Sequence, residues 1–144
     1  MITEFVRAWD ARKSHLEKWF KRTNQEKLSY DVILAAIIDE VINPSTTDGN
    51  KYDSLKIHII DDGDYQGCQI FIVPLKCYQP SPYQYITTYQ DYGSCSGCDL
   101  LEGIRKYDSG TPTEEQVKEY MILALHLLQR LRFYVHYETY LDEE

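Results

Sequence analysis

Apolar side chains recur at three- and four-residue intervals over residues 3–22, with basic side chains between them, and this spacing predicts an amphipathic helix. The same spacing predicts a second helix over residues 29–43, with Ser29 as its N-cap and Pro44 directly after its end. We expect the two segments to form a helical pair over residues 3–43, followed by a polar loop.

Shorter apolar runs rich in β-branched residues occupy the middle of the chain. Residues 55–60 and 67–73 predict two strands. Asp62 and Gly63 lie between them and supply a turn, so we interpret the pair as a hairpin. Prolines between residues 74 and 82 confine the next segment to an irregular connection.

Residues 83–92 alternate between two kinds of side chain, which predicts a third antiparallel strand. Ile86 and Thr88 would share one face of this strand. The other face would carry a row of tyrosine and threonine side chains: Tyr83, Tyr85, Thr87 and Tyr89.

Helical signals return in the last third of the chain. Residues 99–106 predict a short helix. The segment TPTEEQ then contains two pairs with capping-box spacing, Thr111 with Glu114 and Thr113 with Gln116, and predicts a longer helix that reaches about residue 133. The last residues, 136–144, form an acidic and aromatic tail.

The predicted order is α-α-β-β-β-α-α, which indicates an α+β fold. Residues 1–144 would form a single domain in which a small antiparallel three-stranded sheet packs against helices. The β-meander would span residues 55–92 and the C-terminal helices residues 99–135. The sheet face away from the helices would carry part of the tyrosine-rich strand.

Charge narrows the range of partners. The net charge is −8, although the first 27 residues hold seven Lys/Arg against four Asp/Glu, so the remainder is strongly acidic. An acidic surface disfavours direct DNA binding and suits solubility or a basic protein partner. The chain has no apolar run long enough for a membrane span and no secretory signal, so we expect a cytoplasmic protein that does not associate with membranes.

Tyrosine is the unusual component of the composition. The chain has 13 tyrosines, and five of them fall within residues 78–92: Tyr78, Tyr83, Tyr85, Tyr89 and Tyr92. Tyrosine combines a large rigid surface with a polar tip and is enriched at binding surfaces. This row could therefore bind a partner or stack a flat ligand, or it could serve cross-strand packing under a helix or loop.

The segment YQDYGSCSGCD contains Cys95 and Cys98 in Cys-x-x-Cys spacing. This is half of a structural zinc site, for which Cys68, Cys77 and His58 are the further candidate ligands. The same spacing before a helix is used by thioredoxin-like redox proteins, but no later strands are predicted that could complete such a sheet.

The same segment could hold an anion on its backbone amides, because small residues lead into a helix N-terminus. Asp99 could instead cap that helix itself, which is the interpretation we favour. The residues of this candidate ligand loop are Tyr92, Gly93, Ser94, Ser96, Gly97 and Asp99.

Three blocks of the chain resemble segments of a largely uncharacterised family of small accessory proteins encoded by tailed phages and prophages. The blocks are DDGDYQG at residues 61–67, YGSCSGCDLLEGI at 92–104 and TEEQVKEYMILALHLLQ at 113–129, and VINP at 41–44 is similar too. The resemblance covers most of the chain. It implies a virus-encoded protein that acts inside an infected or lysogenic bacterium, and it transfers no catalytic residues.

The leading hypothesis is therefore a phage-encoded, non-enzymatic binding protein that antagonises a bacterial host or defence protein stoichiometrically and needs no cofactor. Its acidic surface and tyrosine-rich strand would meet the partner. One alternative is a protein that sequesters a small phosphorylated nucleotide signal. The other is a zinc-binding or redox protein centred on Cys95 and Cys98.

Overall fold

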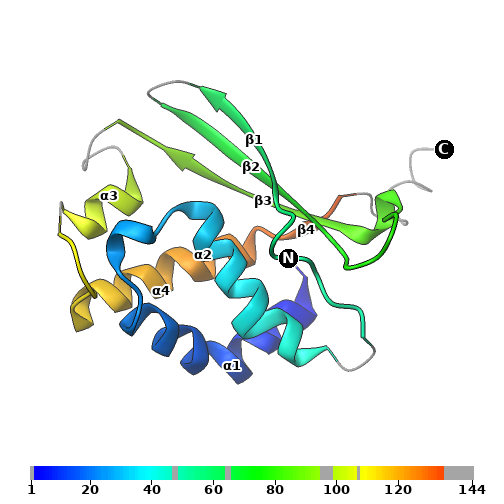
Figure 1. Ribbon diagram of the computed structural model, residues 1–144, viewed down its shortest axis with the longest axis horizontal. Helices are drawn as coiled ribbons and strands as arrows, with labels where there is room; N and C mark the ends of the chain where they lie inside the picture. Colours follow the sequence, from blue (N-terminus) through cyan, green and yellow to red (C-terminus); the bar gives the residue numbers. More distant parts are fainter. Residues whose placement is uncertain (1, 47–48, 64–65, 95–98, 107, 135–144) are drawn as a thin grey trace.

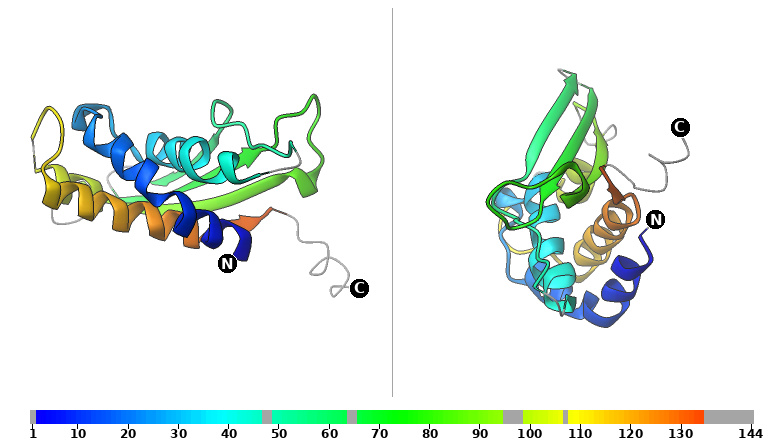
Figure 2. Two further views of the ribbon diagram at one scale, coloured as in Figure 1. Left: turned by 90° about the horizontal axis from the view of Figure 1, so that it is seen from below. Right: turned by 90° about the vertical axis from the view of Figure 1, so that its right-hand side faces the viewer.

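The computed structural model describes residues 2–46, 49–63, 66–94, 99–106 and 108–134. Helices and an antiparallel sheet form two layers, which confirms the α+β class (Figure 1). The helices lie along one face of the sheet, and a β-hairpin extends beyond them (Figure 2). Both layers contribute to one cluster of buried apolar side chains.

The two N-terminal helices form where the apolar spacing predicts them. Helix α1 spans Thr3–Lys21, and a short 3-10 turn, η1 (Gln25–Lys27), leads to α2 (Tyr30–Ile37). The predicted second helix is not α-helical to its end, because it continues as a π-helical turn, η2 (Ile38–Ile42), and a 3-10 turn, η3 (Asn43–Ser45).

Pro44 explains this change of helix type. It has no N–H to donate to the carbonyl of Glu40, four residues earlier, and its ring disfavours a regular α-helix there. The Glu40 carbonyl instead accepts a hydrogen bond from the Nε of Arg12 at 2.8 Å. Helix α1 therefore satisfies a backbone group that the proline leaves open.

The sheet has four strands in the order β1-β2-β3-β4, and all neighbours are antiparallel. The strands are β1 (His58–Gly63), β2 (Gly67–Pro74), β3 (Tyr85–Tyr92) and β4 (Arg132–Phe133). The predicted meander is thus present, but the count of three strands was one too low. Helix α4 (Glu114–Gln129) ends earlier than predicted, and β4 follows it to pair with Ile86 and Thr87 of β3.

The first strand also begins later than predicted, at His58 instead of residue 55. Asp53 organises a turn at that point: its side chain accepts a hydrogen bond from the Leu55 N–H at 3.1 Å, and its carbonyl accepts one from the Lys56 N–H at 3.2 Å. The hairpin itself depends on close backbone contact. A Cβ atom on Gly63, whose φ is 150°, would lie 2.1 Å from the carbonyl oxygen of Gln66, so only glycine fits there.

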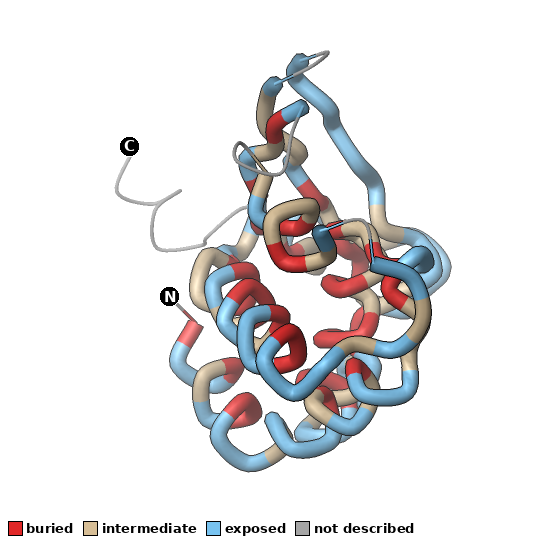
Figure 3. The backbone as a smooth tube through the Cα atoms, turned by 90° about the vertical axis from the view of Figure 1, so that its left-hand side faces the viewer, coloured by how far each residue is buried: buried red, intermediate tan, exposed pale blue. Residues whose placement is uncertain are grey.

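The inner face of the sheet packs on the helices. Phe71, Val73 and Ile86 are fully buried there, and the Thr88 hydroxyl donates a 2.8 Å hydrogen bond to the carbonyl of Leu127 in α4. Buried positions line the space between the elements, whereas β1 is exposed along its whole length (Figure 3). The sheet is therefore fixed to the helices through one face.

The C-terminal helices are positioned by their caps. The capping box of Thr113 and Gln116 forms as predicted: the Gln116 N–H donates to the Thr113 hydroxyl at 3.2 Å, and the Thr113 N–H donates to the Gln116 side chain at 2.9 Å. Thr111 lies before this box and does not begin the helix. The shorter helix α3 spans Leu100–Arg105, close to the predicted range.

Candidate functional site

The face of the sheet away from the helices has its own set of side chains, fixed by strand alternation and register. We call it the outer face. In the described part of the chain no helix covers it (Figure 2). Its side chains come from three strands: His58, Ile60 and Asp62 of β1, Cys68, Ile70 and Ile72 of β2, and Tyr85, Thr87, Tyr89 and Asp91 of β3.

A row of large apolar side chains crosses the middle of the outer face. Ile60 lies directly opposite Ile70, which lies directly opposite Tyr89. Their exposed fractions are 44%, 37% and 46% respectively. Single exposed apolar residues are common on proteins, but adjacent ones that form a patch are typical of interaction sites.

Tyr89 is held in place by Arg130, which follows the end of α4. The Arg130 guanidinium lies 5.1 Å from the centre of the Tyr89 ring. Its Nη1 donates to the Tyr89 carbonyl at 3.2 Å and to the Gln90 side chain at 2.9 Å. The cation–π contact restricts the ring, and a restricted anchor loses less entropy when a partner binds.

Charged groups flank the apolar row. Asp62 and Asp91 lie on either side of Cys68 towards the tip of the hairpin. Burial, and then the negative charges of Asp91 and Asp62, raise the pKa of the Cys68 thiol. The thiol consequently stays protonated and is a poor nucleophile at neutral pH.

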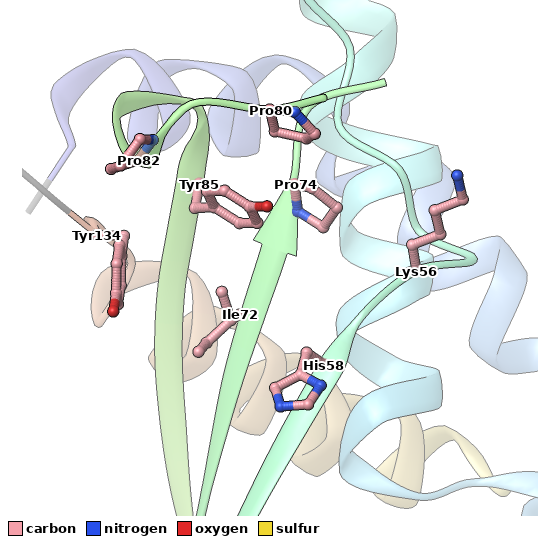
Figure 4. A pocket seen from close by; sticks show the side chains of 8 residues that line it. All are labelled: Lys56, His58, Ile72, Pro74, Pro80, Pro82, Tyr85 and Tyr134. Atoms are coloured by element: carbon pink, nitrogen blue, oxygen red, sulfur yellow. The ribbon is translucent and has the colours of Figure 1, made fainter. Parts of the chain in front are cut away.

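An open hollow of about 560 Å³ lies at the other end of the outer face (Figure 4). Tyr85 and Tyr134 meet there edge to face, with ring centres 6.2 Å apart. Prolines provide much of the remaining apolar wall, and Lys56 and His58 supply the basic groups. The lining residues are Lys56, His58, Ile72, Pro74, Pro80, Pro82, Tyr85 and Tyr134.

The predicted tyrosine row is only partly on the outer face. Tyr85 and Tyr89 lie there, with Ile86 and Thr88 on the inner face as expected. Tyr83 does not, because β3 begins two residues later and Tyr83 lies in a 3-10 turn, η4 (Pro82–Gln84). It lines a separate hollow that also contains Phe5 and Phe133.

By strand alternation Tyr92 belongs to the inner face of β3. Its hydroxyl donates a hydrogen bond to the carboxylate of Asp61 at 2.5 Å. Tyrosines elsewhere serve the core: burial raises the pKa of Tyr52 and Tyr120 to about 12. The unusual tyrosine content is therefore divided between packing and surface, and only Tyr85 and Tyr89 of the predicted site lie on the outer face.

The candidate ligand loop is described only at its ends. Gly93 is buried and Ser94 is exposed, whereas Cys95, Ser96, Gly97 and Cys98 lie outside the described residues. Asp99 caps α3 as predicted: its carboxylate accepts a hydrogen bond from the Leu101 N–H at 3.1 Å and another from the buried hydroxyl of Tyr30. A carboxylate thus already occupies this N-terminus, which disfavours a second anion there.

The described residues contain no cluster of side chains that would support metal or redox chemistry. No group of three or more His, Cys, Asp or Glu side chains gathers there in a way that could hold a metal ion. Cys68 lies near the start of β2, and Cys77 lies three residues beyond the end of that strand, so the extended strand separates the two thiols. The zinc and redox hypotheses rest on Cys95 and Cys98, outside the described residues, and stay predictions.

Sequence reasoning missed the isoleucines of the outer face and Arg130. Alternation in GCQIFIV separates Ile70 and Ile72 from Phe71 and Val73, but apolar residues occupy both sets. The pattern could not indicate which set faces the helices. Arg130 has no sequence signal, since its contact with Tyr89 joins residues 41 positions apart.

No helix among the described residues is both long and apolar enough to cross a membrane. Comparison of the chain with protein-family models, with curated proteins and with solved structures found no match.

Proposed function

We propose that this protein is a non-enzymatic binding protein and that a partner protein docks on the outer face of its sheet. The observation that carries the proposal is the exposed apolar row of Ile60, Ile70 and Tyr89. An apolar centre with a polar rim is the usual composition of a protein–protein interface. Tyr89, held by Arg130, is the anchor residue.

The charges around the row favour a partner with a basic surface. Asp62 and Asp91 lie at one end of the outer face, and the chain as a whole carries a net charge of −8. Such charges speed association with a basic partner and orient it. The hollow beside Tyr85 at the other end could receive an apolar side chain of that partner.

The biological role that we propose is stoichiometric antagonism of a bacterial host or defence protein, in the cytoplasm of an infected or lysogenic cell. The resemblance of the sequence blocks to phage accessory proteins supports this context. A binder of this kind acts by covering a surface of its target and needs neither a cofactor nor a catalytic group.

Affinity capture from bacterial lysate tests the proposal with two matched variants. Ile70→Lys places a charge in the centre of the row, and Ile122→Lys places the same charge on α4, where the side chain is 55% exposed and far from the outer face. A buried hot spot contributes about 2 kcal/mol or more, so we expect Ile70→Lys to lose roughly 30-fold in affinity.

The expected result is a protein retained in stoichiometric amount by the wild type and by Ile122→Lys, and lost with Ile70→Lys. Equal retention by both variants would show that the outer face is not the docking surface. Circular dichroism of the three chains checks that neither lysine unfolds the protein.

A further inference from the structure

Strand β1 forms an open edge of the sheet. It pairs with β2 on one side, and in the described part of the chain no strand pairs with its other side. All six of its residues are exposed, and the hairpin extends beyond the helices (Figures 2 and 3). Proteins usually protect such an edge with proline, charged side chains or a bulge; the sequence HIIDDG contains neither proline nor lysine, and its two charged residues, Asp61 and Asp62, lie together near the hairpin tip.

We propose that β1 pairs with β1 of a second copy of this chain, which joins two four-stranded sheets into one of eight strands. Two identical antiparallel neighbours are related by a two-fold axis perpendicular to the sheet. Rotation about this axis leaves the outer faces of both copies on the same side of the joined sheet. Residues directly opposite each other in an antiparallel pair also share a face, so the numbers of paired residues must sum to an even value.

The side chains of β1 select one register among those allowed. With Ile60 opposite Ile60 of the second copy, an apolar contact lies on the axis and His58 faces Asp62 on both sides of it. This register also uses the strand from His58 to Asp62 in both copies. A hydrogen bond from the His58 imidazole to the Asp62 carboxylate and the apolar contact on the axis therefore reinforce each other.

The two neighbouring registers bring less favourable side chains together or pair fewer residues. A shift towards the hairpin tip places Asp61 opposite Asp61, so two carboxylates face each other across the axis. A shift the other way places Ile59 opposite Ile59 and leaves only His58, Ile59 and Ile60 paired within the strand. Self-pairing about Ile60 thus avoids a pair of carboxylates on the axis and pairs more residues of the strand than the other shift.

The size of the contact sets its strength. Stable dimers usually bury about 1,200–2,000 Å² in total, more than a short edge pairing supplies. We therefore expect a dimer that dissociates on dilution. The outer faces remain open in this dimer and become continuous across the axis, so self-association does not compete with a partner on that face.

Disulfide trapping tests the register. In the full chain, Ile60→Cys places two thiols across the axis at a Cα separation of about 4.5–5.5 Å, within the range for a disulfide. Mild oxidation should convert this variant to a species of twice the chain mass. The control Ile70→Cys lies on the same face one strand inward, roughly 14 Å from its symmetry mate, and should not crosslink more than the wild type.

Charge reversal tests the pairing without cysteine chemistry. His58→Glu places carboxylates opposite Asp62 twice and should weaken the dimer roughly tenfold in analytical ultracentrifugation. Adding Asp62→Lys places opposite charges across both pairs and should recover most of the affinity. The inference is overturned if Ile60→Cys and Ile70→Cys crosslink equally, or if the wild type stays at the mass of one chain throughout a dilution series and Ile60→Cys does not crosslink.

Discussion

Replacement of Phe71 by alanine should lower the free energy of unfolding by about 3–5 kcal/mol. The Phe71 side chain is fully buried between β2 and the helices, and its removal leaves a cavity that a close-packed core fills only in part. Its neighbour Ile70 points to the outer face and is 37% exposed. Urea denaturation followed by circular dichroism measures the change.

Ile70→Ala is the matched control for this experiment, because it removes apolar atoms from the adjacent position on the opposite face. We expect it to cost about 1–1.5 kcal/mol, less than Phe71→Ala, since the Ile70 side chain is already 37% exposed and its truncation leaves no closed cavity. Equal losses for the two variants would contradict the assignment of the inner and outer faces, and with it the candidate site.

Asn43→Ala should have the second largest effect, a loss of about 2–5 kcal/mol of stability. The Asn43 side chain is buried, donates to the Tyr52 carbonyl at 2.9 Å and accepts from the Tyr52 N–H at 2.8 Å. Alanine would leave both buried backbone groups without a partner, and each unpaired group costs about 1–3 kcal/mol. Thermal unfolding measures the loss.

Ser54→Ala provides the comparison for Asn43→Ala. Ser54 donates a 2.8 Å hydrogen bond to Asp39, but this bond is exposed to solvent. Water replaces it at little cost, and we expect a change within about 0.5 kcal/mol. If Asn43→Ala were equally mild, the loop after η3 would not depend on the Asn43 side chain.

Much of the secondary structure follows from local signals. The helical spacing of residues 3–22 closely matches α1, and the alternation around Ile86 and Thr88 identifies the buried face of β3. Thr113 and Gln116 mark the start of α4 through side chains three residues apart. In each case the signal and the structure involve neighbouring residues, so the sequence alone contains the information.

The errors occur where distant residues decide the outcome. The apolar spacing of α4 continues through Leu128 to Leu131, so nothing local indicates that the helix ends at Gln129. The fourth strand exists only because Arg132 and Phe133 reach the edge of β3. The hydrogen-bond partner of the Glu40 carbonyl likewise lies in α1, 28 residues earlier in the chain.

In the candidate site, too, local patterns were predicted correctly and contacts between distant residues were missed. Tyr85 and Tyr89 were predicted to share a face because alternation within one strand is local. Ile60 and Ile70 were missed because their alignment with Tyr89 depends on the register of three strands. Tyr83 was placed wrongly because the strand begins after the η4 turn, at Tyr85.

A partner docked on the outer face should protect Tyr89, and covalent labelling of tyrosine in the free and partner-bound protein measures that protection. Tyr89 is 46% exposed on the outer face, and Tyr78 is 95% exposed in the loop after β2. We expect the partner to lower labelling of Tyr89 several-fold and to leave Tyr78 labelled as in the free protein. Equal labelling of Tyr89 with and without the partner would contradict docking on the outer face.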